Sequence, residues 1–477
     1  MTIHQSQFEK RLLIGIFLLI GIIFFAFSIY ANINLIHPLE TYIDEQVTFK
    51  GVYRILTADS ASQFWWEISN GGDLRYGRIL WYTLAVAGYI PFSIWSTEGI
   101  ILTGRLISAS FLISAYALLT ITFINNWRFR IPCFLILLSL PFSSYFSTIP
   151  KPEPFALLSL GIFLILSKKN SLELNRPYWI WLGIAFGCKI SFLPALVILV
   201  ISAAWINNLS TINKRDQCEL LLKTIIYLYV GFCIAMPIFI TPSMIVLVML
   251  FCIYFMLQIF INKNLSNILS LFVVAGIITV PAIRDLLPFN LGIRSAIEEY
   301  IYATFYKINK GFNSSEIYSS LDWLSHFIKN WTFSPSLVAQ IILIIMGLLF
   351  TTMLFLVPTS SGTRAIRVQL LIPLAIGLIL FANPIFAVTN RLWGMYLLPG
   401  FVFMVIACFS YADFVNHTNE KMRSNPMMRL SRSLSTLACF TLIICSLLYW
   451  IPHTLSDFIF LGNRSSNAIF HPWNHGI

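Results

Sequence analysis

Charged residues are scarce in this chain. They make up 11% of its 477 positions, against 58% hydrophobic residues, whereas soluble proteins carry about 25% charged residues. So little charge cannot cover the surface of a water-soluble protein, and we infer that lipid is the solvent for most of this surface. Uncharged apolar runs recur from residue 12 to residue 451. They have the ~17–25 residues that a helix needs to cross ~30 Å of hydrocarbon.

The apolar runs also lack the period-two alternation that is typical of lipid-embedded barrel strands. Because lipid offers no partner to an unpaired backbone N–H or C=O group, helices are the structure that remains. We therefore predict an all-α fold, a polytopic transmembrane helical bundle. The first run, 12–30, is longer than the apolar part of a signal peptide and has no small-residue cleavage site, so we expect a membrane anchor there.

We expect about thirteen spans. A single long helix is the alternative for 178–188 and 190–206, because the first of these runs is too short to span alone. The predicted spans are 12–30, 101–124, 131–149, 153–167, 178–188, 190–206, 223–240, 243–261, 266–282, 336–357, 368–382, 392–411 and 433–451.

These spans predict one bundle over residues 1–451 and three external segments. The first external loop, 31–100, is expected to contain interfacial helices. A second external loop is expected at 283–335, and a short external tail at 452–477. Neither an internal repeat nor a separate soluble domain is visible in the sequence.

Paired cysteine motifs are missing. The eight cysteines lie mostly inside apolar runs, and none belongs to a CxxC pair. Neither a disulfide framework nor a zinc site is therefore indicated. We expect the cysteines to be small residues of the helical core.

The basic residues do not gather in one patch, although the net charge is +11. They lie in short connectors, as the positive-inside rule predicts, so nucleic acid is not an expected partner. The basic residues of the connectors at 10–11, 128–130, 168–176, 214–223, 263, 364–367 and 421–432 all fall on the cytoplasmic side if the apolar run 79–95 lies along the interface instead of crossing. We adopt that topology. Aromatic residues of the first loop are spaced like interfacial anchors; they are Trp65, Trp66, Trp81, Tyr82 and Trp95.

Ionisable residues near the external face need an explanation, because a charge at membrane depth costs at least ~2.5–3.5 kcal/mol. Each has an ordinary interpretation: Arg105 and Arg391 can snorkel to headgroups, and Lys189 can pair structurally with Glu153. Together, cations and carboxylates at one face fit chemistry on a phospholipid-like donor. The residues are Asp44, Glu45, Arg105, Lys151, Glu153, Lys189 and Arg391.

At these residues the chain resembles the GT-C class of membrane glycosyltransferases, particularly the branch with bacterial aminoarabinose transferases and protein O-mannosyltransferases. The resemblance covers residues 1–210 and, less fully, 380–410. This chain has Glu153 where the family usually has Asp, and it is shorter than relatives with a large soluble external domain. The matching elements, in order, are Asp44-Glu45, Arg105 to Ala109, Pro152-Glu153, Gly183 to Ser191, and Arg391 with Tyr396 to Pro399.

The resemblance implies transfer of a sugar from an undecaprenyl- or dolichyl-phosphate carrier by direct, inverting displacement. Asp44 would be the general base, while Glu45 and Glu153 would position the acceptor or a cation. The donor phosphate would be bound by Lys189 and Arg391, with Arg105 a weaker candidate. Further residues for positioning the acceptor or a cation are His37, Lys151 and Tyr396.

The expected partners are a polyprenyl-phosphate-linked sugar, membrane lipid and a lipid, glycan or protein acceptor whose identity the sequence leaves open. The sequence identifies no certain cofactor. The carboxylates could bind a divalent cation through their oxygen atoms, but the sequence does not identify the ligands. HExxH, P-loop, GxSxG and dinucleotide motifs are missing from the sequence. By resemblance we expect a bacterial inner membrane, with the site on the periplasmic side.

A polytopic transporter or lipid-linked glycan flippase is the alternative from another functional class, because it would also place charges inside a bundle. Such proteins often contain inverted repeats with matching broken helices, and none is visible here. An oligosaccharide polymerase or ligase of related chemistry is a further alternative.

Overall fold

The computed structural model describes ten stretches of the chain, and the secondary-structure elements in these stretches are helices. They are residues 7–33, 43–69, 78–169, 172–189, 192–207, 214–236, 347–348, 370–380, 398–416 and 426–463. Four helices among them are long and apolar enough to cross a membrane. The predicted number of about thirteen spans is therefore not confirmed, and the spans expected at 243–261 and 266–282 lie outside the described residues.

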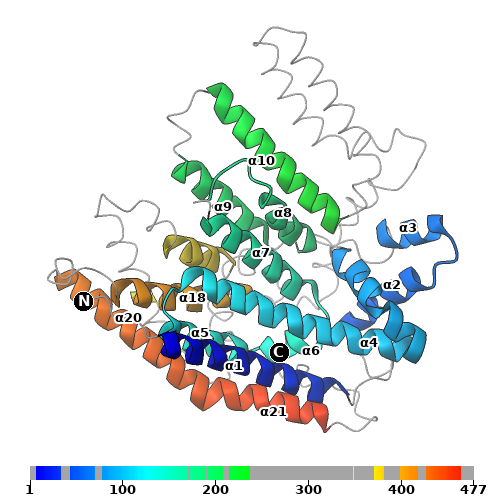
Figure 1. Cartoon of the computed structure of the whole chain (residues 1–477), viewed down its shortest axis with the longest axis horizontal. Helices are drawn as coiled ribbons and strands as arrows, with labels where there is room; N and C mark the ends of the chain where they lie inside the picture. Colours follow the sequence, from blue (N-terminus) through cyan, green and yellow to red (C-terminus); the bar gives the residue numbers. More distant parts are fainter. Residues whose placement is uncertain are drawn as a thin grey trace, which may run out of the picture.

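Two long helical rods run side by side along one edge of the bundle (Figure 1). One is α1 (Gln7–Ile33), and the other joins α20 (Pro426–Cys445), a π-helix (Ser446–Trp450) and α21 (Ile451–Gly462). The rods are parallel, because Phe24 packs on Phe458 and the Tyr30 hydroxyl donates to Asn463 Oδ1 at 2.6 Å.

The second rod continues well past residue 451, where we expected the last span to end. Phe458 and Leu461 are buried against the bundle, so apolar packing extends the helix to Gly462. The π-helix between α20 and α21 has a local cause. Pro452 has no N–H to bond to the carbonyl one turn earlier, and the N–H of Ile451 bonds instead to the Ser446 carbonyl. Residues 464–477 of the expected tail lie outside the described residues.

Helix α4 (Ile79–Phe123) is two helices joined at Ser96, whose φ of 55° and ψ of −135° are not helical. The arms fold back on each other, since the Pro91 carbonyl lies against Gly99 and the Leu84 side chain lies beside Gly104. The first arm is thus a hairpin partner of the second. Its orientation relative to a membrane stays a prediction.

The first loop contains two helices, α2 (Ile43–Leu56) and α3 (Ala61–Ser69), which share a small apolar core with the first arm of α4. Their existence confirms helices in this loop, and their interfacial position stays a prediction. The expectation that Trp81 is an interfacial anchor is wrong. Its ring is 2% exposed and packs directly on Gly51, which has no side chain to exclude it.

The span expected at 131–149 is broken. Helix α5 (Trp127–Ser139) ends before Pro141, and a short buried helix, α6 (Ser143–Thr148), follows. The residue before a proline is forced out of the α region, and Leu140 is extended, with a ψ of 144°. Hydroxyl groups satisfy the carbonyls that the break releases, as membrane-embedded backbone requires: Ser143 Oγ donates to the Leu137 carbonyl, and Thr454 Oγ1 donates to the Ser139 carbonyl.

The next helices are α7 (Pro152–Lys169), α8 (Trp179–Cys188), α9 (Leu193–Ile206) and α10 (Lys214–Ala235). Lys189 separates α8 from α9 with extended backbone angles, so the single-helix alternative is wrong. The two helices form a hairpin, because the Asn207 amide, just after α9, donates to the Leu172 carbonyl, just before α8. Neither reaches 30 Å, since their 10 and 14 residues correspond to about 15 and 21 Å.

Helix α18 (Leu398–Asn416) is buried along nearly all of its length, and the helix Leu370–Leu380 contacts it where Gly377 approaches Gly400 and Met404. The six described cysteines are free and buried, which confirms their prediction as core residues. They are Cys133, Cys188, Cys233, Cys408, Cys439 and Cys445.

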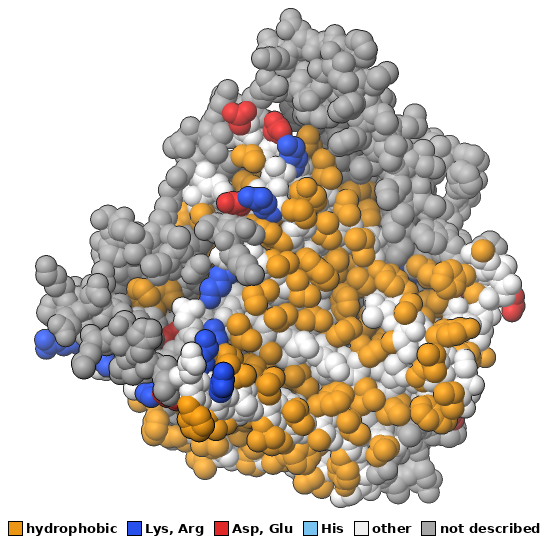
Figure 2. All heavy atoms as spheres, viewed as in Figure 1, with side chains coloured by type: hydrophobic (Ala, Val, Ile, Leu, Met, Phe, Trp, Pro, Cys, Tyr) orange, Lys and Arg blue, Asp and Glu red, His pale blue; other side chains and the backbone are white. Residues whose placement is uncertain are grey.

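One end of the bundle, called the basic end here, is defined by Arg128, Arg130 and Lys168. Arg130 Nε donates to the Ile124 carbonyl and Lys168 Nζ to the Thr122 carbonyl, so both cations cap the C-terminus of α4. Figure 2 shows a broad apolar surface with Lys and Arg side chains gathered along one edge of it. This distribution is typical of a protein whose apolar belt lies in lipid.

Candidate functional site

The other end of the bundle, called the site end here, contains a buried ion pair. Lys189 Nζ lies 3.0 Å from Glu153 Oε1, and the side chains are only 11% and 5% exposed. Glu153 is in the first turn of α7, and Lys189 occupies the tip of the α8–α9 hairpin. The pairing predicted from sequence as an ordinary structural contact is therefore present.

Two further cations are buried at the site end. Arg105 is 2% exposed in the second arm of α4, and Lys151, which is 6% exposed, immediately precedes α7. Lys151 Nζ lies 5.9 Å from the centre of the Tyr145 ring, a distance at which the ring face attracts a cation. A desolvated cluster of cations is a suitable environment for an anionic group.

A hydrogen bond places the acidic helix of the first loop next to these residues. Thr48 on α2 donates from Oγ1 to the Pro150 carbonyl at 3.5 Å, directly before Lys151 and one turn of α2 after Asp44. On the other side, the Ser108 hydroxyl of α4 donates to the Phe146 carbonyl at 2.8 Å and lies 3.3 Å from the Ile149 carbonyl. The segment that carries Lys151 and Glu153 is thus held between α2 and α4.

The remaining predicted site residues stay predictions. Asp44 and Glu45 belong to the first turn of α2, but the structure describes only their backbone. His37, Arg391 and Tyr396 lie outside the described residues, so the expected approach of Arg391 to Lys189 is untested.

One buried oxygen of the site is unsatisfied. Glu153 Oε2 is inaccessible to solvent and accepts no hydrogen bond within the described part of the chain, while Oε1 of the same carboxylate binds Lys189. Leaving a buried acceptor without a partner costs about 1–3 kcal/mol. An arrangement that retains such a cost is typical of a site that a ligand, a water molecule or an ion completes.

A divalent cation at this site stays a prediction. Among the residues that the structure describes, no group of three or more His, Cys, Asp and Glu side chains could hold a metal ion. The side chains of the neighbouring acids Asp44 and Glu45 are not among the described ones. A cation on Glu153 would also have to displace or tolerate the Lys189 ammonium 3.0 Å away.

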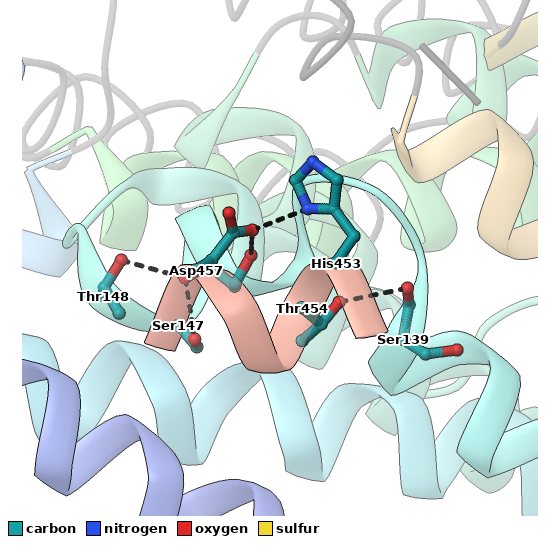
Figure 3. Close-up of polar contacts among 7 residues, drawn as sticks. Ser139, Ser147, Thr148, His453, Thr454 and Asp457 are labelled. Atoms are coloured by element: carbon teal, nitrogen blue, oxygen red, sulfur yellow. Dashed lines mark hydrogen bonds and ion pairs between the residues drawn. The ribbon is translucent and has the colours of Figure 1, made fainter. Parts of the chain in front are cut away.

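A second polar cluster, which the sequence did not lead us to predict, joins α6 to α21 (Figure 3). Asp457 Oδ2 accepts from the Ser144 hydroxyl at 2.9 Å and lies 3.1 Å from His453 Nδ1. We predicted an external tail here and therefore did not predict a contact between His453 and Asp457. Their spacing of four residues, which places two side chains on the same face of a helix, is the sequence signal for this contact.

Arg78 is another residue that sequence analysis did not single out. It is 1% exposed, and its guanidinium carbon lies 4.1 Å from the centre of the Trp81 ring. An arginine directly before a long apolar run was the only sequence signal. Stacking on a tryptophan stabilises a buried guanidinium. Here the contact joins Arg78, the residue before α4, to Trp81 in the first turn of that helix.

No protein-family model and no curated protein matches this chain. Among solved structures, it is similar to the crystal structure of the Archaeoglobus fulgidus oligosaccharyltransferase in the apo form, with a TM-score of 0.45 and 11% sequence identity. The similarity covers 98% of this chain and 62% of the oligosaccharyltransferase, so this chain spans less than two thirds of the length of that protein. A similarity at this level does not assign a function.

Proposed function

We propose that this chain is an integral membrane glycosyltransferase of the GT-C type. It transfers a sugar from a polyprenyl-phosphate donor to an acceptor at the external face of the membrane, with inversion at the anomeric carbon. Asp44 accepts the proton of the attacking hydroxyl, and Lys189 with Arg391 and Arg105 neutralises the leaving phosphate. Glu45, Glu153, His37, Lys151 and Tyr396 position the acceptor or a cation.

The observation that carries this proposal is the gathering of charged groups from separate helices at the site end. Lys189 and Glu153 are in contact at 3.0 Å. Arg105 and Lys151 are buried, and their segments are joined by the contact of Ser108 with the Phe146 and Ile149 carbonyls. The Thr48 contact brings the helix of Asp44 to the same segment. Cations that hold a phosphate and a carboxylate that takes a proton are the two requirements of this reaction.

The depth of the charges favours a lipid-borne donor over a soluble one. Exposed apolar side chains cover α1, including Leu18, Ile22 and Ile23, so lipid reaches the bundle surface. The site end lies where such helices terminate, the level at which a polyprenyl carrier presents its phosphate. The acceptor is a lipid, glycan or protein that reaches this level from outside.

The test is to compare lipid-linked sugars and surface glycans in cells with and without the gene, and then to reconstitute the purified chain with the lipid that accumulates. We expect release of polyprenyl phosphate together with sugar transfer. Movement of the intact lipid-linked sugar across the vesicle membrane without transfer would instead support the flippase alternative. Loss of neither a glycan nor a glycolipid from the deletion strain would contradict both.

A further inference from the structure

The ion pair at the site end is poorly suited to a permanent structural role. Burying two charges is compensated only if the geometry is good and the remaining lone pairs are hydrogen-bonded. Lys189 contacts one oxygen of Glu153, while the other oxygen is buried and accepts no hydrogen bond from any residue that the structure describes. The described residues therefore provide a partner for only one of the two carboxylate oxygens of Glu153.

The surroundings of the pair favour an anion at the place that Glu153 occupies. Helix α7 begins at Pro152, and α9 begins one turn after Lys189, where the N–H of Phe192 donates to the Lys189 carbonyl. Helix N-termini carry partial positive charge and bind anions. The buried cation Lys151, two residues before Glu153, adds to this potential.

Lys189 also occupies a position from which its side chain can change partner. It lies outside both helices, with φ of −151° and ψ of 116°, at the tip of the hairpin. Its ammonium group is a point charge on a flexible four-carbon stem with no fixed binding direction. A phosphate with several oxygens can compete for such a cation with a carboxylate that uses only one.

We propose that the Lys189–Glu153 pair is exchangeable: in the unliganded chain the Glu153 carboxylate holds the cation that later binds the donor phosphate. This inference rests on the proposed function, because it takes the anion to be the phosphate of a polyprenyl-phosphate donor. Donor binding moves Lys189 Nζ from Glu153 to the phosphate. Glu153 is then free to accept a hydrogen bond from the acceptor hydroxyl, so the donor binds before the acceptor.

The experiment measures the affinity of the full chain in nanodiscs for undecaprenyl phosphate. If Lys189 is released in about a tenth of the unliganded molecules, removing its competitor tightens binding about tenfold. We therefore expect Glu153→Gln to bind about tenfold more tightly and Lys189→Gln to bind at least about tenfold more weakly. The double variant should bind undecaprenyl phosphate as weakly as Lys189→Gln does, because it lacks the Lys189 ammonium group that removal of the Glu153 carboxylate would release.

Failure of the exchange and failure of the proposed function give different results. If Lys189→Gln weakens binding but folded Glu153→Gln binds as the wild type does or more weakly, the exchange is overturned and the phosphate site stands. If the wild type shows no saturable binding, both are overturned.

Folding of each variant is checked by gel filtration and thermal unfolding. Should Glu153→Gln fail to fold, Glu153→Asp retains the charge but is one methylene shorter and contacts Lys189 less closely. The exchange then requires Glu153→Asp to bind undecaprenyl phosphate several-fold more tightly than the wild type, and an unchanged or weaker affinity overturns it.

Discussion

Asp44 lies in the first turn of α2, one turn before the Thr48 contact with Pro150. Its assignment as general base predicts that Asp44→Asn, which has nearly the same size but cannot take up a proton, lowers the transfer rate by ~10²-fold or more. Carrier-lipid binding and folding should be unaffected. The measurement is the transfer rate of the purified variant with saturating donor.

Glu45→Gln is the matched control, because it makes the same chemical change at the next position of the helix. We expect a smaller loss of rate from it. Normal transfer by Asp44→Asn would remove Asp44 from the mechanism, and a larger loss from Glu45→Gln would exchange the roles of the two acids.

Asp457 is buried and receives hydrogen bonds at one oxygen from two sides, α6 and its own helix. Asp457→Ala leaves the Ser144 hydroxyl and the His453 ring facing a gap. We expect the free energy of unfolding to fall by about 1–3 kcal/mol, the cost of orphaned buried polar groups. Thermal or denaturant unfolding in detergent measures this change.

Ser456, which is exposed on the same helix, provides the control for that substitution. Ser456→Ala should change stability by less than about 0.5 kcal/mol. Equal stability of the Asp457→Ala variant and the wild type would mean that the contacts in Figure 3 do not hold α21 to α6.

At the scale of elements, α8 and α10 approach so closely that their glycines touch backbone. A Cβ at Gly183 would collide with the Leu228 carbonyl, and one at Gly231 with the Ile180 carbonyl. We expect Gly183→Ala to destabilise the chain by about 1–3 kcal/mol, because backbone cannot rotate away as a side chain can. The change is measured as a shift in the unfolding midpoint in detergent.

Gly15 on α1 is the matched control, since nothing lies within 4 Å of a Cβ built there. Gly15→Ala should be neutral or should stabilise the helix by up to about 1 kcal/mol, because alanine is the better helix former. A comparable loss from both substitutions would point to a general intolerance of alanine rather than to the α8–α10 contact.

At the scale of the whole molecule, the basic end and the site end should face opposite sides of the membrane. Asn125 is exposed at the basic end, and Asn463 is exposed at the site end next to Tyr30. We expect Asn125→Cys to react with a membrane-impermeant maleimide only from the cytoplasmic side, and Asn463→Cys only from outside. The six described native cysteines are buried and give little background.

Reversed labelling of both positions would mean that the whole bundle is inverted, with the start of α1, where Glu9 contacts Arg128, on the external side. Labelling of both positions from the same side would contradict the claim that the basic end and the site end face opposite sides of the membrane. An inverted bundle would move the proposed site to the cytoplasmic face, where a different donor pool is available.

Several helices were predictable from sequence because their cause is local. The apolar run 12–30 lies within α1 and 153–167 within α7, and the break at Lys189 was one of two alternatives. The broken span at Pro141 was missed although the proline marks it, because the surrounding residues are apolar enough to continue. The extension to Gly462 was missed because its amphipathic face is stabilised only by contact with α1 and α6.

The site was predicted in part. Glu153 and Lys189 were selected as ionisable residues in apolar surroundings, and one of the two interpretations offered was their pairing, which the structure contains. The cluster of Ser144, His453 and Asp457 was not anticipated, since its hydrogen bond joins residues 313 positions apart. No periodicity or motif relates two such positions.

The sequence by itself determined that this chain is helical and apolar-surfaced, because backbone hydrogen bonding in lipid is a requirement of each segment separately. It also determined which few residues carry charge at membrane depth. Only the tertiary structure decided which charges meet, which oxygen of Glu153 is left unsatisfied and that Trp81 is buried on Gly51. The physical reason is that burial and pairing depend on the packing of helices distant in the chain, and a linear pattern does not contain those distances.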